Sequence, residues 1–197
     1  DEIYEWIIFD DFKHTSIASL SKEAQKNCVV INGVSKCYAM TGWRIGYIAA
    51  NAEIVKNVQK LQGQSTSGPC SISQAASVEA LTGPHDDVLA MVREFEKRRD
   101  VMIDQLNSIA GVSCNKPNGS FYSFPDFSAF YGKKEPRGKV LQGSLDFTEY
   151  LLKEKKVAIV PGIAFGADAN ARMSFASSLD QIEEGVKRIK EAVELLK

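Results

Sequence analysis

Residues 28–36 read Cys-Val-Val-Ile-Asn-Gly-Val-Ser-Lys, and this stretch decides how the fold is interpreted. Its short apolar first part is typical of a strand that is buried on both faces. Ile45–Ala50 is a similar run, and Ile3–Phe9 is apolar and rich in strand formers. Helical patterns over Ala52–Leu61 and Cys70–Leu81 follow these runs. Strands that alternate with helices predict an α/β layer structure with a largely parallel sheet.

A long helix is predicted to start near Pro84, which can occupy a first helical turn. Apolar side chains then recur at helical spacing until Gly111, so the helix would have about 24 residues and a length of roughly 36 Å. A helix of that length can bridge two domains. We therefore predict one domain that covers residues 1–105 and ends in this helix, and a second that covers residues 106–197.

The second half of the chain reads as an α+β domain. Short strands are predicted at Val112–Asn115, Phe121–Phe124, Ala158–Val160 and Arg172–Phe175, and helices at Asp146–Lys156 and Leu179–Leu196. The last helix has the clearest signal, because Ser178 and Gln181 form a capping-box pattern. Its apolar residues also step by three and four along the sequence, which is typical of an amphipathic helix.

Composition and charge exclude several classes of function. The chain has 197 residues, a net charge of -1 and a pI near 6.2, so we expect no nucleic-acid partner. Its longest apolar runs, such as Val157–Val160, are too short to span a bilayer, so we expect no membrane partner. The four cysteines show no metal-ligand spacing, which favours free thiols, a cytoplasmic location and no metal site: Cys28, Cys37, Cys70 and Cys114.

Lys36 is the candidate catalytic residue. It follows the carboxyl end of a predicted strand, where open α/β sheets bind ligands. Partial burial disfavours the ammonium form of a lysine, and a neutral amine is what a Schiff base with an aldehyde requires. A lone lysine in this position is usually a surface or ion-paired residue, so the functional interpretation depends on its neighbours.

Those neighbours read Gly33-Val-Ser-Lys-Cys-Tyr-Ala-Met-Thr-Gly-Trp-Arg-Ile-Gly46. This run resembles the lysine signature of the class I/II aminotransferases, which are pyridoxal-phosphate (PLP) enzymes of fold type I. The resemblance implies that Lys36 forms a Schiff base with PLP and shuttles a proton at the substrate α-carbon. It places Arg44 on the cofactor phosphate, which a guanidinium can grip with two hydrogen bonds. Ser35 could donate a further hydrogen bond to that phosphate.

Two further motifs carry the same resemblance. Asp1-Glu-Ile-Tyr4 is similar to the Asp-x-x-Tyr of the family. There the aspartate pairs with the pyridinium nitrogen, which makes the ring an electron sink, and the tyrosine bonds the ring 3-oxygen. Glu2 is a competing carboxylate, but the spacing to Tyr4 favours Asp1. Arg172, in the run Ala171–Ala176, resembles the family's late-strand arginine, which clamps the substrate α-carboxylate.

Two stretches resemble turns of the family's small domain. They are Pro117–Tyr122 and Val157–Gly166, whose glycines permit conformations with positive φ. We predict that Phe121 and Phe165 belong to the core, and that Trp43 and Tyr47 pack against the sheet. The resemblance thus implies part of a PLP-transferase large domain, which is α/β with a mostly parallel sheet, followed by a C-terminal α+β small domain.

The implied activity is amino-group transfer between an amino acid and a 2-oxo acid. Met40–Tyr47 is most similar to the aspartate-type members. The alternatives are a PLP-dependent lyase or decarboxylase of the same fold, or a non-catalytic domain fragment. Members of the family are about twice as long as this chain and are homodimers that share their sites between subunits. We therefore expect a homodimer for the full-length protein, and weak or no PLP binding and no activity for this chain alone.

Overall fold

A computed structural model describes all residues from 1 to 197. The chain divides into two compact units, Asp1–Val92 and Arg93–Lys197. The division falls inside helix α4 (Asp86–Asn107), which confirms the predicted long helix. The domain boundary at residue 105 stays a prediction. No helix combines the length and the apolar character that a membrane span requires.

Unit 1 contains a two-stranded sheet, β1 (Val30–Gly33) and β2 (Gly46–Ala49). Both strands were predicted, but they pair antiparallel, with Gly33 opposite Gly46, so the prediction of parallel pairing is wrong for these strands. The reason is the connection between them. It contains a single short 3₁₀ turn, η2 (Thr41–Trp43), whereas parallel neighbours need a longer crossover, usually an α-helix.

The predicted strand at Ile3–Phe9 is also wrong. The backbone there turns back on itself twice, because the Glu5 N–H donates to the Glu2 carbonyl oxygen (2.9 Å) and the Ile7 N–H donates to the Tyr4 carbonyl oxygen (2.9 Å). Ile7 and Phe9 are nevertheless buried, with 0% and 2% of their surface exposed. Turns and strands can both be buried. The apolar content of this segment therefore indicates burial and does not identify a strand.

The other elements of unit 1 are helical. They are η1 (Ile17–Ser19), α1 (Lys22–Asn27), α2 (Ala52–Ser65) and α3 (Ser71–Thr82), of which α2 and α3 confirm the predicted helices. The side chain of Asn51 caps α2 by accepting a hydrogen bond from the Ile54 N–H (3.0 Å). Large apolar side chains on both helices are exposed, Leu61 by 75% and Ile72 by 76%.

Unit 2 contains a three-stranded antiparallel sheet in the order β3 (Tyr122–Ser123), β5 (Ala171–Ser174), β4 (Val160–Pro161). Each of these strands overlaps a predicted one. The fourth predicted strand, Val112–Asn115, is wrong, because it forms only an isolated bridge between Ser113 and Asp126.

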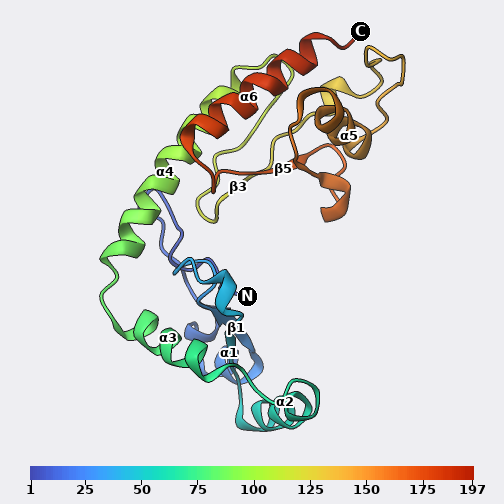
Figure 1. The fold of residues 1–197 in the computed structure, drawn as a ribbon. Helices are drawn as coiled ribbons and strands as arrows, with labels where there is room; N and C mark the ends of the chain where they lie inside the picture. The colour runs from blue at the N-terminus through green and yellow to red at the C-terminus, as the bar shows by residue number, and fades with distance from the viewer. The chain divides into compact units, whose positions relative to one another are not determined.

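Helices α5 (Ser144–Lys155) and α6 (Leu179–Glu194) complete unit 2, with two 3₁₀ turns, η3 (Ser128–Phe130) and η4 (Gly162–Phe165). The predicted cap of α6 is present, since the Gln181 N–H donates to Ser178 Oγ (3.4 Å). Helix α6 runs beside the C-terminal part of α4 (Figure 1), and a small groove between them is lined from both helices. The predicted apolar stripe faces the core through Ile182, Val186, Ile189 and Val193.

The start of α5 is capped from a distant part of unit 2. Its N-cap residue is Gly143, which has no side chain to offer. Asp168 takes over this role, because its Oδ1 accepts hydrogen bonds from the Ser144 N–H (2.9 Å) and the Ser144 hydroxyl (2.6 Å). The Ser144 Oγ in turn accepts from the Ile163 N–H (3.1 Å). These contacts tie η4 to the start of α5.

We expect Asp168→Asn to destabilise the fold in a pH-dependent way. The hydroxyl and the N–H of Ser144 hold the pKa of the Asp168 carboxyl below its usual range. A carboxyl of this kind stabilises the fold fully above its unfolded pKa, about 3.9, and this stabilisation is lost as pH falls through the lower folded pKa. The difference in free energy of unfolding between wild type and variant should therefore be largest above about pH 4 and shrink below it. Urea unfolding at several pH values measures it.

Asp104→Asn is the matched control, because Asp104 is exposed on α4 and its carboxylate caps no helix. A difference between wild type and Asp168→Asn that stays constant with pH, or that the control reproduces, would contradict the role of Asp168 as a charged cap.

Candidate active site

Lys36 lies in a turn that directly follows β1. The Tyr38 N–H donates to the Val34 carbonyl oxygen (3.3 Å), and the Ala39 N–H donates to the Lys36 carbonyl oxygen (3.2 Å). Val34 and Cys37 are buried on either side, with 0% and 1% of their surface exposed. Lys36 and Ser35 between them are half-buried. The backbone of the candidate lysine is thus fixed by its buried neighbours.

The N-terminal segment packs against the same end of β1. The Glu2 N–H donates to the Ile31 carbonyl oxygen (2.8 Å), and the Cys37 thiol donates to the Ile3 carbonyl oxygen (3.3 Å). A Cβ on Gly33 would lie 3.2 Å from Ile3 Cδ1 and 3.1 Å from the Gly46 Cα, so a larger residue here would require its neighbours to shift by a few tenths of an ångström. The structure therefore brings the predicted Asp1–Tyr4 motif and the Lys36 turn together.

The two candidate carboxylates at the N-terminus have different surroundings. The Glu2 Oε2 atom lies 3.4 Å from His14 Nε2, so this carboxylate is engaged by a histidine. Asp1 is exposed, and its Oδ1 accepts a hydrogen bond from the Ile3 N–H (3.1 Å). Asp1 thus keeps acceptor capacity for a ligand, which favours it over Glu2 as the cofactor-binding residue.

Arg44 lies on the same connection between β1 and β2 as Lys36. It has left-handed backbone angles, φ 53° and ψ 50°, which are unfavourable for a residue with a side chain and often mark functional sites. Its side chain is exposed, and Nη1 donates to the Thr41 carbonyl oxygen (2.8 Å). A guanidinium has five N–H donors, so Arg44 retains donors for an anion.

Aromatic side chains contact one another beside Cys37, through Tyr38 of the same turn. The Tyr38 hydroxyl lies 3.3 Å from His85 Nε2, and the Trp6 ring stacks on the His85 ring with 4.7 Å between centroids. Burial raises the pKa of the Cys37 thiol and of the Tyr38 hydroxyl. Cys37 therefore stays a thiol at neutral pH and does not compete with Lys36 as a nucleophile.

Arg172 is the predicted substrate residue, and it lies in unit 2. It is half-buried in β5, opposite Val160 of β4. Its guanidinium carbon lies 4.3 Å from the centroid of the Tyr122 ring and 4.9 Å from that of the Phe165 ring. Cation–π contacts of this kind hold the guanidinium in place. Its N–H edge can then meet a carboxylate in the two-pronged geometry.

Residues 1–189 match the sequence model of the family described as aminotransferase class I and II. The chain belongs to this family. It is 45% identical over 196 residues to a probable aspartate/prephenate aminotransferase of Rickettsia prowazekii, and 43% identical over 196 residues to an aspartate aminotransferase of Rhizobium meliloti. These matches span 100% of the chain and 49% and 48% of the relatives, so the chain covers about half their length.

Solved structures agree with this assignment. The crystal structure of the Rhizobium meliloti aspartate aminotransferase matches with a TM-score of 0.96 at 43% identity, over 100% of this chain and 49% of that one. An aromatic aminotransferase from Pyrococcus horikoshii matches with a TM-score of 0.88 at 35% identity, over 98% of this chain and 50% of that one. The predicted α/β fold class of a PLP transferase is thereby confirmed.

The predictions for three aromatic side chains are wrong. Phe165 is 49% exposed and flanks Arg172, so its assignment to the core is wrong, whereas Phe121 is half-buried and packs on Phe95. The sequence signal for the exposure of Phe165 was its position shortly after the Pro-Gly turn. Trp43 and Tyr47 are 48% and 39% exposed, so the prediction that they are packed on the sheet is wrong for this chain.

Proposed function

We propose that the full-length protein is a PLP-dependent aminotransferase that exchanges an amino group between an amino acid and a 2-oxo acid. The observation that supports this most strongly is local. The Asp1–Tyr4 segment is hydrogen-bonded to β1 and to the turn that carries Lys36. The segment that carries the Asp1 carboxylate and the Tyr4 hydroxyl is therefore held against the strand and the turn that carry the Lys36 amine.

The donor groups of unit 1 fit the parts of PLP. Lys36 offers an amine for the aldehyde, and Asp1 offers a carboxylate for the ring nitrogen. Tyr4 offers a hydroxyl for the ring 3-oxygen. Ser35 and Arg44 offer a hydroxyl and a guanidinium for the phosphate. When bound, PLP supplies the aldehyde and an electron-accepting ring.

The side chains of the protein then have distinct tasks. Arg44 binds the phosphate by charge-assisted hydrogen bonds, and Asp1 keeps the ring nitrogen protonated by ion pairing. Lys36 would move a proton at the substrate α-carbon as a general base. Arg172 binds the substrate α-carboxylate with its guanidinium fork. We further propose aspartate as the preferred substrate, from the likeness of Met40–Tyr47 to the aspartate-type members.

Assembly and location are part of the same proposal. We infer that the full-length protein forms a homodimer that completes its sites with residues of both subunits, as the resemblance implies. We also infer a cytoplasmic location. Its support is that all four cysteines are free thiols, which suits a reducing compartment.

Product analysis on the full-length protein with PLP tests the activity. We expect aspartate and 2-oxoglutarate to give oxaloacetate and glutamate in equal amounts, with no turnover when the 2-oxo acid is left out. A lyase or decarboxylase would consume the amino acid without an acceptor. Consumption that does not depend on the acceptor would therefore contradict amino-group transfer, and no consumption at all would favour a non-catalytic role.

Arg172→Gln is expected to weaken substrate binding in particular. Glutamine removes the positive charge, and a hydrogen bond to a charged group is worth about 1.5–3 kcal/mol. That corresponds to a rise in KM of about 10- to 150-fold for amino acids. Steady-state kinetics measure it, and the absorbance of bound PLP should be unchanged. Arg137→Gln is a matched control, because Arg137 pairs with Glu154 at the surface. An unchanged KM in Arg172→Gln would contradict the role of Arg172 in carboxylate binding.

A further inference from the structure

Arg99 is the most deeply buried charged residue of unit 2, with 0% of its surface exposed. It lies on helix α4, where its Nε donates to Asp100 Oδ1 (2.8 Å) and its Nη2 lies 3.4 Å from Glu96 Oε1. Two carboxylates therefore compensate the buried guanidinium, which would otherwise be very costly to desolvate. Because burial of a charge is costly, we expect Arg99 to have a specific role.

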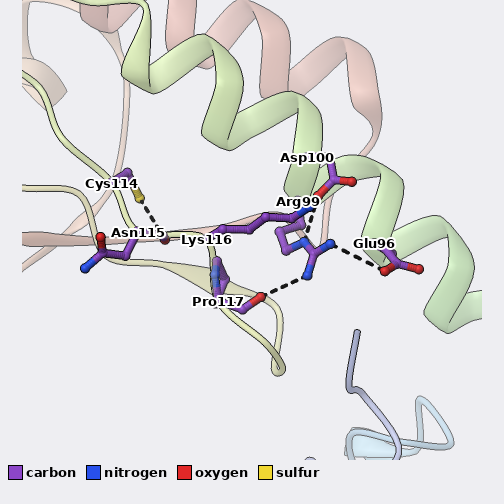
Figure 2. Close-up of polar contacts among 7 residues, drawn as sticks. All are labelled: Glu96, Arg99, Asp100, Cys114, Asn115, Lys116 and Pro117. Carbon is purple, nitrogen blue, oxygen red and sulfur yellow. Dashed lines mark hydrogen bonds and ion pairs between the residues drawn. The ribbon is translucent and has the colours of Figure 1, made fainter. Parts of the chain in front are cut away.

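The remaining guanidinium arm points away from its own helix. The Arg99 Nη1 donates to the Pro117 carbonyl oxygen (3.0 Å), as Figure 2 shows. The neighbouring Lys116 ammonium pairs with Asp100 (3.0 Å). Further along α4, the side-chain amide of Asn107 accepts from the Cys114 N–H (2.8 Å) and donates to the Cys114 carbonyl oxygen (3.1 Å). Helix α4 thus holds the segment from Cys114 to Pro117 at three successive points.

The same face of α4 also holds the far end of the following turn. Phe95 lies one helical turn before Arg99, and its ring packs on Phe121 with 5.7 Å between centroids. Between Pro117 and Phe121 the chain makes a turn in which Ser120 has a φ of 65°. An αL conformation at a non-glycine residue persists only where the surroundings fix it. Arg99 and Phe95 fix the two ends of this turn.

The turn leads directly to the aromatic surface under Arg172. Tyr122 follows Phe121 and pairs with Ser174 in the sheet, and the Phe175 N–H donates to the Phe121 carbonyl oxygen (3.0 Å). The Arg172 guanidinium lies over the Tyr122 ring at 4.3 Å. A displacement of the Pro117–Phe121 turn would therefore shift Tyr122 and, with it, the guanidinium that rests on it.

We propose that Arg99 is a positioning residue for substrate carboxylate recognition, acting through the Pro117–Phe121 turn on Tyr122 and Arg172. The proposal rests on the proposed aminotransferase function. Arg99 itself touches no substrate. The forked guanidinium of Arg99 is suited to this task, because it contacts Asp100 and Glu96 on α4 and also the carbonyl oxygen of Pro117 in the turn.

The test compares two substrates of the full-length, PLP-loaded protein that differ only in the α-carboxylate. One is an amino acid, and the other is the primary amine that carries the same side chain. Single-turnover absorbance of the bound PLP gives the second-order rate constant for each. In Arg99→Met we expect the constant for the amino acid to fall about 10- to 100-fold, since small displacements of positioning groups cost up to about that much. The constant for the amine should stay at the wild-type value.

Two further measurements separate positioning from general damage. Arg93→Met is the matched control, because Arg93 is exposed on the same helix and should leave both constants unchanged. Calorimetric titration with succinate should give a weaker dissociation constant for Arg99→Met than for Arg93→Met. If Arg99→Met does not fold, Arg99→Lys keeps the buried charge without the fork, and the same selective loss is expected from it.

The outcomes are distinct. Equal losses for amino acid and amine in the Arg99 variants, or an equal effect of Arg93→Met, would overturn the positioning role and leave the aminotransferase proposal intact. A wild-type protein that reacts with no amino acid would refute the proposed function itself, and the role of Arg99 with it.

Discussion

Lys36→Ala is expected to abolish covalent attachment of PLP and to lower kcat by at least about 10²–10⁴-fold, the usual contribution of a positioned general base. Alanine has no amine to condense with the aldehyde and none to move a proton at the substrate α-carbon. The visible absorbance of lysine-bound PLP in the full-length protein measures the first effect, and single-turnover kinetics measure the second.

Borohydride reduction followed by peptide mapping makes the test specific to one side chain. In wild type, the reduced cofactor should be found on Lys36, whose turn is fixed by buried Val34 and Cys37. In Lys36→Ala no other lysine should carry it. Lys60→Ala is the matched control, because Lys60 is exposed on α2 and should leave labelling and kcat unchanged. Labelling of a different residue in wild type would be incompatible with the proposed site.

The grouping of residues around Lys36 could be predicted because these residues lie close together in the sequence. The lysine, Ser35 and Arg44 share one connection between two strands, so their proximity follows from chain connectivity. The helices were predictable for a similar reason. Apolar residues that recur with helical spacing over several turns distinguish a helix from other elements. The buried residues of α6 confirm its predicted apolar stripe.

Strand direction and the N-terminal segment could not be predicted in the same way. An apolar run such as Ile3–Phe9 indicates burial, but hydrogen bonding decides between strand and turn, and the partner of the Glu2 N–H is Ile31, far along the sequence. Parallel pairing was inferred from alternation of elements, yet the direction of β2 depends on how the residues between Gly33 and Gly46 reverse the chain.

Long-range polar contacts were also beyond the sequence. Nothing in the pattern around Arg99 distinguishes it from Arg98, although the first has 0% of its side chain exposed and the second 27%. The contact of Arg172 with Tyr122 and Phe165 joins three separate parts of the chain, and it is visible only once β3, β5 and η4 are placed.

Gly162→Ala is expected to have the largest effect on stability. A Cβ at this position would overlap the backbone carbonyl oxygens of Ala167 and Asn170. Neither oxygen can move freely, because the Gly162 N–H donates to the Asn170 carbonyl oxygen (2.8 Å) and the Asn170 N–H donates to the Ala167 carbonyl oxygen (3.0 Å). Strain from overpacking and the loss of a hydrogen bond together should lower the free energy of unfolding by about 3 kcal/mol.

The same substitution should also affect substrate binding at Arg172. Gly162 opens η4, and this turn carries Phe165, whose ring lies 4.9 Å from the Arg172 guanidinium. We therefore expect a rise in KM for amino acids in whatever fraction of Gly162→Ala remains folded. Chemical denaturation measures the stability and steady-state kinetics measure the KM.

Gly185→Ala provides the contrast for this experiment. Gly185 lies inside α6, where an added Cβ has no other atom within 4 Å, so alanine should raise the free energy of unfolding by about 0.5–1 kcal/mol. The two glycine-to-alanine changes are thus expected to shift the free energy of unfolding in opposite directions. At Gly162 there is no room for a side chain, whereas at Gly185 there is room. Equal stability of Gly162→Ala and Gly185→Ala would show that the turn at Gly162 can relax, and the geometric argument for it would fail.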